Sequence, residues 1–308
     1  KKNPSEIFDT FELESHKAAS MGQVHKATLN ETELAVKIQY PGVAESIQSD
    51  LKLVKPFALK MFNLKAKDSE KFFKEVEDKL VEETNYKLEI ERSIEFSKAC
   101  KSIPHLKFPH YYKEYSNNKI ITMSWLHGQH LTDFVKTSEF DNQEIRNKLG
   151  QALWDFYMYQ MYELKKVHAD PHPGNFIITP DFELGVIDFG CIKEIPEDFH
   201  KPYFELTKSE SLNNPERFEK NLFLLEILTK EDTSTEKKLI AEVFHNLLSL
   251  FARPFNSDKF DFSSHNFFEE IAELGEKLAK SEDLRKLNAN RGSKHLLYIN
   301  RTFFGLYN

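Results

Sequence analysis

Apolar and polar positions in the first forty residues follow the pattern of a β-hairpin. Two β-rich runs, residues 17–28 and 34–38, flank the polar segment 30–33, and short β-rich runs around a polar turn are typical of paired strands. Proline and glycine at positions 41–42 interrupt the pattern directly afterwards. The chain is therefore expected to begin its first sheet with this hairpin and to continue into helices.

A second hairpin is predicted further along the chain. Residues 111–115 and 120–125 are β-rich, and the Ser-Asn-Asn segment 116–118 separates them. Serine and asparagine are common in turns because their short side chains hydrogen-bond to nearby backbone groups. The amino-terminal part of the chain is thus expected to be a sheet into which helices are inserted.

Helical spacing dominates the segments on either side of that hairpin. Residues 69–100 are predicted to form one long amphipathic helix with Asp68 or Ser69 as its N-cap. A buried helix is predicted over residues 144–167, leading directly into His168. Later Phe-rich stripes make the rest of the chain predominantly helical, and we interpret them as core rather than as a ligand site.

The composition is that of a soluble globular protein. Of the 308 residues, 40% are apolar and 30% are charged, and the net charge of -7 is spread along the chain. Nucleic-acid binding is not expected, because it normally requires a basic face. Cys100 and Cys191 have no metal-binding spacing, so a reducing, cytoplasmic location is predicted.

The sequence predicts neither a membrane-spanning helix nor a secretory signal peptide at its start. No apolar run approaches the roughly 20 residues that a spanning helix needs. The start, Lys-Lys-Asn-Pro, is not a signal peptide. We interpret the sequence as part of a longer protein.

Chemistry-bearing side chains are concentrated in residues 167–190. Asp170 and Asn175 lie in a loop rich in proline and glycine, and two short β-rich runs then lead to Asp188-Phe189-Gly190. Because a hairpin returns the chain to its starting point, Asp188 is expected to face Asn175. Oxygen ligands placed in this way suit Mg²⁺, and Asp170 is then the residue that orients or deprotonates an acceptor. The order of Asp170, Asn175, two β-rich runs and Asp188-Phe189-Gly190 favours phosphoryl transfer as the function.

An alternative metal site uses the same segment. His168, Asp170, His172 and Asp188 could together ligate Zn²⁺ or iron. This alternative leaves Asn175 unexplained. For His168 and His172 individually we prefer a structural role, in which the ring hydrogen-bonds to backbone near the loop.

Lys37 lies within an otherwise apolar run, residues 34–38. A buried ammonium is costly unless it is paired with an anion, so Glu89 on the predicted long helix is expected to be its partner. The other carboxylates considered on that helix are Glu82, Glu83 and Glu91. A solvated lysine at a sheet edge is the alternative. Lys37 and Glu89 are therefore candidate catalytic residues alongside Asp170.

A nucleotide would be held by two further segments. The predicted phosphate-covering segment is Ala18, Ala19, Ser20, Met21, Gly22 and Gln23. Its single glycine implies a stiffer conformation than a glycine-rich loop would allow. Met123 is the predicted gatekeeper beside adenine, and residues 124–126 form the predicted hinge, with Ser124 and Leu126 as binding residues. The predicted cofactors are ATP or ADP together with Mg²⁺.

The ordered motifs resemble those of the ABC1/UbiB family of atypical kinases, also called ADCK or AarF-like. The motifs that carry the resemblance are residues 17–25, 36–43, 83–89, 168–175 and 188–190. The resemblance runs from about residue 4 to the end of the chain. It implies an α+β, bilobal, protein-kinase-like fold. Since β-rich sequence gives way to helices near residue 127, residues 1–126 are expected to form a small β-rich N-lobe and residues 127–308 a larger helical C-lobe.

Two features depart from the family pattern. The KxGQ motif, which lies upstream of the kinase core in family members, has no counterpart, and Asn85 replaces the second acidic residue of the ExD motif. Family members are linked to quinone biosynthesis and lipid homeostasis near membranes, with ATP binding and ATPase activity. By resemblance, the expected partners are a nucleotide, a quinone or lipid small molecule and a peripheral membrane contact.

The short segment after Gly190 bears on the acceptor. A helix is predicted to begin near residues 196–198, which leaves no room for a long activation segment. An ATPase or small-molecule kinase in quinone or isoprenoid-lipid metabolism is the first hypothesis, and a non-catalytic nucleotide sensor that regulates a lipid or protein partner is the second. A phosphotransferase like aminoglycoside or choline kinases is a third hypothesis, which does not account for the alanine-rich segment.

Overall fold

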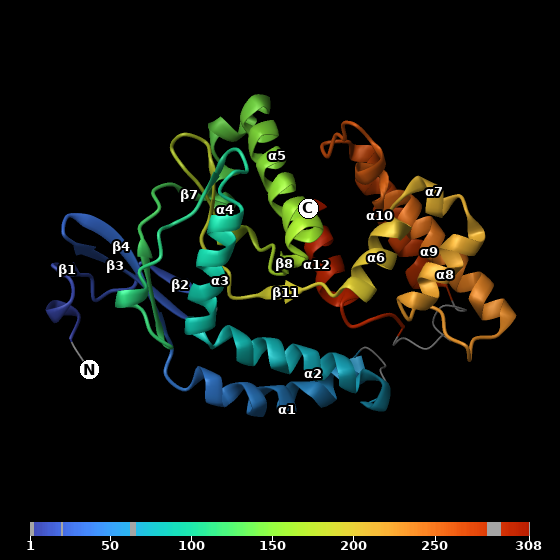
Figure 1. The fold of residues 1–308 in the computed structure, drawn as a ribbon, viewed down its shortest axis with the longest axis horizontal. Coiled ribbons are helices and arrows are strands. Elements are labelled where there is room, and N and C mark those ends of the chain that lie inside the picture. Colours follow the sequence, from blue (N-terminus) through green and yellow to red (C-terminus); the bar gives the residue numbers. More distant parts are fainter. Residues whose placement is uncertain (1–2, 20, 62–65, 282–290, 308) are drawn as a thin grey trace.

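The computed structural model describes residues 3–19, 21–61, 66–281 and 291–307. A β-rich part at one end of the molecule continues into a mostly helical part at the other (Figure 1). This arrangement confirms the α+β class predicted from the sequence. The predicted lobe boundary between residues 126 and 127 stays a prediction; it falls between two strands that belong to different sheets.

The β-rich part is built on a five-stranded sheet. Its strands are β1 (Thr10–Phe11), β2 (Lys17–Ala19), β3 (Gly22–Leu29), β4 (Thr32–Gln39) and β6 (Ile120–Ser124). The order is β1-β3-β4-β6, with β2 also paired to β3. The first predicted hairpin is confirmed as β3–β4, although its first run, residues 17–28, is divided between β2 and β3. Asn30 and Glu31 at its turn both have positive φ, 48° and 62°, the geometry whose twist matches that of paired strands.

Only one strand of the second predicted hairpin forms. β6 pairs with β4, whereas residues 113–115 form a 3₁₀ turn, η2 (Lys113–Tyr115), and Tyr111 makes an isolated bridge to Met123. The Ser116 hydroxyl donates to the Tyr112 carbonyl at 2.6 Å and accepts from the Thr122 N–H at 2.9 Å. These side-chain bonds satisfy backbone groups that a regular strand would have paired.

Two helices replace the single long helix predicted over residues 69–100. They are α2 (Ala66–Glu83) and α3 (Tyr86–Ala99). The Asn85 side chain caps α3 by accepting a hydrogen bond from the Leu88 N–H at 3.2 Å, and asparagine is a favoured N-cap residue. The predicted cap at Asp68 or Ser69 is also wrong, because α2 already begins at Ala66.

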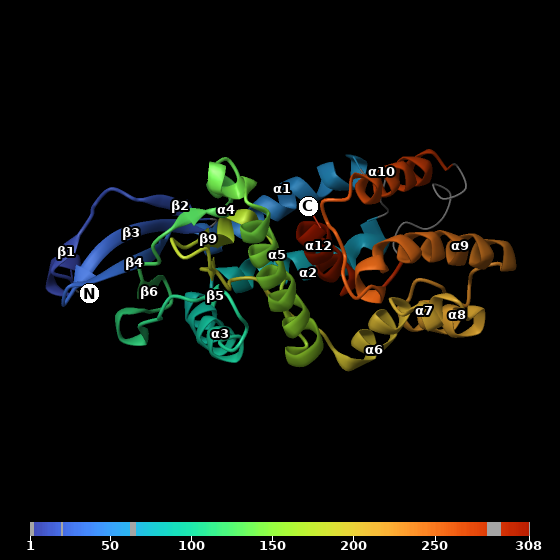
Figure 2. The same cartoon turned by 90° about the horizontal axis from the view of Figure 1, so that it is seen from above.

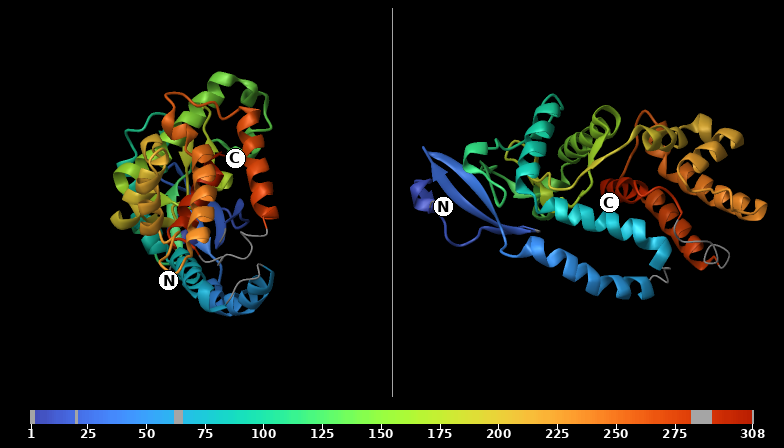
Figure 3. Two further views of the ribbon diagram at one scale, coloured as in Figure 1. Left: turned by 90° about the vertical axis from the view of Figure 1, so that its right-hand side faces the viewer. Right: turned by 60° about the horizontal axis from the view of Figure 1, so that its bottom comes forward.

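Two long helices run side by side along one edge of the molecule. They are α1 (Val43–Met61) and α2, and Figure 3 shows them leading away from the first sheet. Among the described residues, no helix has both the length and the apolar character needed to cross a membrane.

Smaller sheets support the chemistry-bearing loop. The second sheet has the order β5 (Leu106–Lys107), β10 (Leu184–Val186), β9 (Phe176–Ile178) and β7 (Gln129–His130). The predicted pairing of residues 176–178 with the run that starts at 184 is confirmed as β9–β10. β8 (Lys166–His168) pairs with β11 (Ile192–Glu194). The loop that carries Asp170 thus connects β8 of the two-stranded sheet to β9 of the four-stranded sheet.

The helix predicted over residues 144–167 ends earlier than expected. α5 (Gln143–Tyr159) continues into a π-helical turn, η4 (Gln160–Leu164), and Lys165 then has a positive φ of 49° before β8 begins. The Gln160 side chain accounts for this ending, since it donates to the Phe156 carbonyl and accepts from the His168 N–H at 2.7 Å. The early ending gives the chain room to enter β8.

The remaining helices surround the largest apolar core. They are α4 (Leu131–Phe134), α6 (Glu197–Leu206), α7 (Ser209–Leu212), α8 (Pro215–Leu224), α9 (Ser234–Phe251), α10 (His265–Lys280) and α12 (Leu296–Tyr307). Short turns are η1 (Pro4–Glu6), η3 (Ser138–Asp141), η5 (Pro173–Asn175) and η6 (Arg253–Asn256). Phe218, Leu222 and Leu225 are buried in this core, as predicted for that stripe. Figure 2 shows α5 and α12 together near the middle of the molecule.

Candidate active site

Lys37 is the centre of a buried charge cluster between β4, α3 and the loop after β10. Its Nζ donates to Glu89 Oε1 at 2.7 Å and to Asp188 Oδ2 at 2.9 Å, and Lys37 is only 5% exposed. The predicted pairing of Lys37 with Glu89 is therefore present, and Lys37 is not a solvated edge lysine. Because a buried ammonium needs anionic partners, this contact ties three elements together at one atom.

Burial and charge together set the proton affinities in this cluster. Burial works against the Lys37 cation, but the Asp188 and Glu89 carboxylates outweigh it and raise the pKa of Lys37 well above its ordinary value. Burial also works against the Asp188 anion, yet Lys37 holds the pKa of Asp188 down to about 2. Burial raises the pKa of Glu89 to about 7. Asp188 is thus the carboxylate that stays anionic, which is the state that ligates a cation.

The Asp188-Phe189-Gly190 segment is fixed at each of its residues. Asp188 Oδ1 accepts a hydrogen bond from the Gly190 N–H at 2.8 Å. Phe189 is fully buried, and its ring centroid lies 5.5 Å from that of Phe96 on α3. A Cβ at Gly190 would lie 3.2 Å from Asp188 Oδ1. The segment is therefore packed against the same helix that supplies Glu89.

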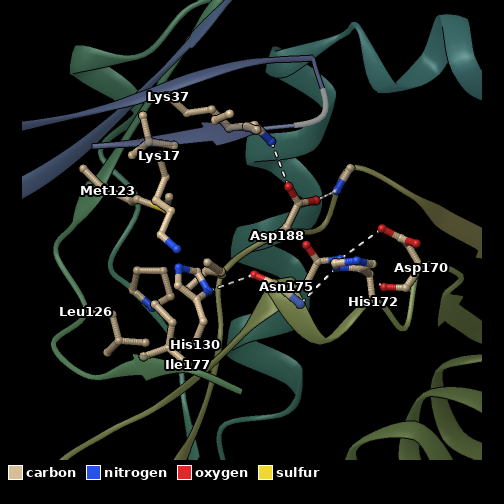
Figure 4. Close-up of a pocket in the computed structure, with 18 of the residues that line it drawn as sticks. Lys17, Lys37, Met123, Leu126, His130, Asp170, His172, Asn175, Ile177 and Asp188 are labelled. Carbon is tan, nitrogen blue, oxygen red and sulfur yellow. Dashed lines mark hydrogen bonds and ion pairs between the residues drawn. The ribbon is translucent and has the colours of Figure 1, made fainter. Parts of the chain in front are cut away.

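The loop after β8 holds Asp170 and Asn175 together. Asn175 Nδ2 donates to the Asp170 carbonyl at 3.0 Å and to Asp170 Oδ2 at 3.1 Å. The Asn175 carbonyl accepts from the Ile187 N–H at 3.1 Å, which places Asn175 beside the residue before Asp188. Figure 4 shows the three polar side chains around the same space. The hairpin thus returns Asp188 to this loop, while the Asn175 amide hydrogen-bonds to Asp170.

His168 and His172 have structural contacts. His168 is completely buried, its Nδ1 lies 3.4 Å from the Tyr157 hydroxyl, and burial lowers its pKa. The ring therefore contacts a tyrosine rather than the backbone that we expected. His172 Nδ1 accepts from the Gly174 N–H at 3.0 Å and so caps η5. In the described ranges, no group of three or more His, Cys, Asp or Glu side chains is arranged to hold a metal ion, so the Zn²⁺ or iron alternative has no support.

A cavity of about 950 Å³ lies between the first sheet and this loop, a volume suited to a small-molecule or cofactor site. Most of the predicted site residues line it. They are Ala18, Ala19, Met21, Lys37, Glu89, Met123, Ser124, Leu126, Asp170, Asn175 and Asp188. The fold thus brings residues of the first sheet and residues of the segment 167–190 to the same cavity (Figure 4).

Two described residues of the alanine-rich segment do not line the cavity. Gly22 and Gln23 belong to β3 and are not among the residues that line the cavity. A Cβ on Gly22 would lie 2.2 Å from the Ile38 carbonyl oxygen, so the glycine permits close packing onto β4 rather than contact with a ligand. Ser20 lies outside the described residues. Ala18 and Ala19 form part of β2, so the predicted loop is in part a strand.

The predicted hinge lies at the opposite end of the cavity from Asp170. Met123 is buried, and the N–H groups of Ser124 and Trp125 donate at 2.8 Å to the carbonyls of His110 and Glu33, respectively. Backbone donors of this segment are therefore partly used within the protein. An adenine ring would have to use other backbone groups of the hinge.

Several lining residues were not predicted as site residues. Lys17, Glu83, His130 and Arg301 all face this cavity. Burial, followed by the nearby Asp188 and Asp170 carboxylates, raises the pKa of Glu83. Arg301 is the single charged residue of α12, and a lone cation in an apolar helix was the signal that could have identified it. Its partner could not be read from helical spacing alone.

A buried lysine paired with a helix glutamate, facing a loop with aspartate and asparagine and a following Asp-Phe-Gly, defines a protein-kinase-like domain. Comparison with known families agrees with this class. The model of the ABC1 atypical kinase-like domain matches residues 1–221. The chain belongs to this family, as the ordered motifs indicated.

Curated relatives carry kinase names. AarF domain-containing kinase 1 of Drosophila melanogaster is 33% identical over 219 residues, which cover 66% of this chain and 40% of that protein. The chloroplastic Protein ACTIVITY OF BC1 COMPLEX KINASE 3 of Arabidopsis thaliana is 30% identical, covering 62% of this chain and 27% of that protein. The chain therefore spans less than half the length of these relatives.

A solved structure shares the fold. The complex of Rv3197 with erythromycin from Mycobacterium tuberculosis aligns over 98% of this chain and 73% of that chain, with a TM-score of 0.70 and 23% sequence identity. At this identity the likeness establishes the fold alone. It confirms that the kinase-like α+β fold predicted from the sequence is the observed one.

Proposed function

We propose that this domain binds ATP together with Mg²⁺ in the cavity and uses the nucleotide for phosphoryl transfer to a small molecule or to water. The observation that carries the proposal is the position of Lys37, whose Nζ contacts both Glu89 and Asp188 at the edge of a cavity that also holds Asp170 and Asn175. Phosphoryl transfer needs a cation on the phosphates, oxygen ligands for a metal and a residue that orients the acceptor. These side chains meet each need.

The side chains around Lys37 have distinct proposed roles. Lys37 neutralises phosphate charge, and Glu89 holds its ammonium in place. Asp188 and Asn175 fit Mg²⁺, because Asp188 is held anionic beside Lys37 and the amide oxygen of Asn175 is a suitable ligand. The bound ion would supply charge neutralisation for the phosphates. Asp170 would orient or deprotonate the acceptor.

Other lining residues would hold the rest of the nucleotide. Ala18, Ala19 and Met21 lie where they could cover the phosphates, and Met123, Ser124 and Leu126 where they could flank adenine. Gly22 and Gln23 do not line the cavity and have no proposed role in binding, and Ser20 lies outside the described residues.

A short connection after Gly190 supports a small acceptor. β11 starts at Ile192 and α6 at Glu197, so the segment that docks protein substrates in protein kinases is reduced to a few residues. Water or a small molecule fits this site better than a protein segment does. We further propose, from the family resemblance alone, that the acceptor or the process served belongs to quinone or isoprenoid-lipid metabolism, with the protein in a reducing compartment at a membrane surface.

A nucleotide sensor without turnover is the second candidate. The pairing of Ala18 with Gln23 and of Ala19 with Gly22 favours this candidate. A paired strand changes its backbone conformation less readily than a glycine-rich loop when the phosphates of a bound nucleotide are rearranged during turnover. In this candidate the protein would bind ATP or ADP and present a changed surface to a lipid or protein partner.

Two measurements test the proposal and separate the candidates. Calorimetric titration with ATP and ADP, each with Mg²⁺ and with chelator, should detect magnesium-dependent binding. Phosphate release from ATP should then be present in the wild type and reduced in Asp170→Asn. Binding without any release would favour the sensor, and absence of magnesium-dependent binding would contradict both candidates.

A further inference from the structure

Arg301 of α12 reaches from the helical part of the molecule to Asp170. Its Nη2 donates to Asp170 Oδ1 at 2.5 Å, and its side chain is 57% exposed on the wall of the cavity. The other oxygen of the same carboxylate, Oδ2, accepts from Asn175 Nδ2. Both oxygens of Asp170 therefore have a donor, one from its own loop and one from a helix 131 residues later.

The position of α12 against the Asp170 loop is fixed by packing. A Cβ on Gly305 would lie 2.2 Å from Pro171 Cγ, so only glycine allows the helix to approach this closely. Gly305 lies one helical turn after Arg301, on the same side of the helix. On another side of α12, Ile299 and Phe303 are buried in the core. The Arg301 guanidinium therefore projects from a helix whose backbone packs directly against Pro171, the residue next to Asp170.

A second set of contacts joins α12 to α2. Lys294, just before the helix, lies 2.9 Å from Glu75 Oε2, and the Tyr298 hydroxyl donates to the Glu75 carbonyl at 3.4 Å. α12 is thus attached both to the Asp170 loop and to α2, two elements that each contribute residues to the cavity lining. A helix held on two sides can position a side chain more precisely than a mobile loop can.

The charges in the cavity explain why a cation is needed at this place. Glu83, Asp170 and Asp188 all line it, and burial, followed by repulsion from Asp188 and Asp170, raises the pKa of Glu83. Lys37 is already shared between Glu89 and Asp188. Arg301 is the cation in contact with Asp170. A planar guanidinium defines the orientation of a carboxylate in a way that a lysine ammonium does not.

We propose that Arg301 is a positioning residue for Asp170. With Asn175 it fixes the plane of the carboxylate, and it acts on turnover through Asp170 rather than by binding the nucleotide. This inference rests on the proposed function, in which Asp170 orients or deprotonates the acceptor.

The test compares ATP hydrolysis by four proteins, namely wild type, Arg301→Ala, Asp170→Asn and the double variant. Arg301→Ala should lower kcat by about 10- to 100-fold, the range expected when a catalytic group is misplaced, while KM for ATP stays near the wild-type value. Arg301→Lys should recover part of the loss, and guanidinium ion added to Arg301→Ala should recover more. The double variant should be no slower than Asp170→Asn, because Arg301 acts through that carboxylate.

Arg253→Ala is the matched control. Arg253 also pairs with a carboxylate, that of Glu270, at a partly exposed site in another part of the helical region. Its replacement should change neither kcat nor KM. Thermal unfolding of each variant reports whether the protein is folded before its kinetics are compared.

Three results would overturn the inference. They are an unchanged or higher kcat in Arg301→Ala, a change in KM alone, and a double variant slowed relative to Asp170→Asn by the same factor as the single variant is slowed relative to wild type. The last result would mean a general structural role. If the wild type does not hydrolyse ATP, or if Asp170→Asn is as fast as wild type, the proposed transfer to water with Asp170 as the orienting residue fails together with the inference. If Asp170→Asn is slow and Arg301→Ala is not, the inference alone fails.

Discussion

Lys37 and Asp188 lie 151 positions apart in the chain, and Lys37 Nζ donates a hydrogen bond to Asp188 Oδ2 at 2.9 Å. Because Lys37 also donates to Glu89 on α3, one ammonium connects the first sheet, a helix and the loop after β10. Binding of a nucleotide and a metal ion would have to share or displace these contacts.

Replacing Lys37 by methionine should weaken ATP binding and leave a folded protein, because methionine keeps the buried stem and removes the charge. A hydrogen bond to a charged group contributes about 1.5–3 kcal/mol, so the expected loss of affinity is about 10- to 100-fold. Calorimetric titration measures it. Lys26→Met is the control, since Lys26 pairs with Glu33 on the same sheet and does not line the cavity. Equal affinities in Lys37→Met and wild type would remove Lys37 from the site.

Replacing Asp188 by asparagine should abolish most of the stabilisation that Mg²⁺ adds to ATP. A ligand at about 100 times its Kd stabilises the native state by about 2.7 kcal/mol. In a domain of this size, each kcal/mol raises the Tm by about 2–4 °C or slightly less. Each variant is compared with itself, with ATP and Mg²⁺ or with ATP and chelator. Asp181→Asn, in the exposed turn between β9 and β10, should keep the full increment. If Asp188→Asn keeps it too, the metal is bound elsewhere.

Asp188 should also make stability depend on acid pH. Burial opposes its ionisation, but Lys37 lowers its folded pKa from 3.8 to about 2. A depressed pKa means that the unfolded state binds more protons, so the stabilising contribution is complete above pH 4 and is lost as the pH falls toward 2. The loss amounts to at most about 2 kcal/mol. Denaturant unfolding of wild type and Asp188→Asn across this range should give converging stabilities at low pH, and parallel curves would contradict the assignment.

Replacing Ala19 by glycine should change the ratio of ATP to ADP affinity. Ala19 is the last residue of β2 and lines the cavity. Glycine at this position permits closer backbone approach to a ligand, but it loses more conformational entropy on folding, which costs about 0.5–1 kcal/mol. The expected change in the ratio is therefore about two- to fivefold. Ala44→Gly, at an exposed position of α1, controls for flexibility elsewhere. Identical ratios in wild type and Ala19→Gly would mean that β2 does not act on the nucleotide.

The pairing of Lys37 with Glu89 could be predicted because it follows from a general cost. A lysine in an apolar strand requires an anion, and among the several carboxylates of the predicted helix the inward-facing stripe favoured Glu89. The return of Asp188 to Asn175 was predictable for a similar reason, since β9 and β10 are joined by a short turn. Local pattern and one physical rule were enough in both cases.

The break at Asn85 was missed although its signal is local. Apolar positions recur near helical spacing on both sides of residues 83–85, so periodicity alone joined α2 and α3 into one helix. Asn85 then competes for the backbone by capping α3. The break matters for the site, because it puts Glu89 in the first turn of α3 and Glu83 at the end of α2.

Arg301 illustrates what spacing could not provide. The apolar stripe of α12 identifies the face that enters the core, but it does not say which loop lies against the other face. That contact depends on the close approach of Gly305 to Pro171, a tertiary feature. The same limit applies to residues 111–115, whose β-rich composition gave way to hydrogen bonds made by Ser116.

The position of α12 in the chain has a consequence for biosynthesis. A ribosome makes Lys37, Glu89, Asp170 and Asp188 in that order, and Arg301 emerges more than a hundred residues after Asp188. A nascent chain could therefore assemble the lysine cluster while the carboxylate of Asp170 still lacked its arginine. Under the positioning role proposed for Arg301, full ATP turnover would begin only after synthesis had passed α12, so an incomplete chain would bind nucleotide and consume it about 10- to 100-fold more slowly.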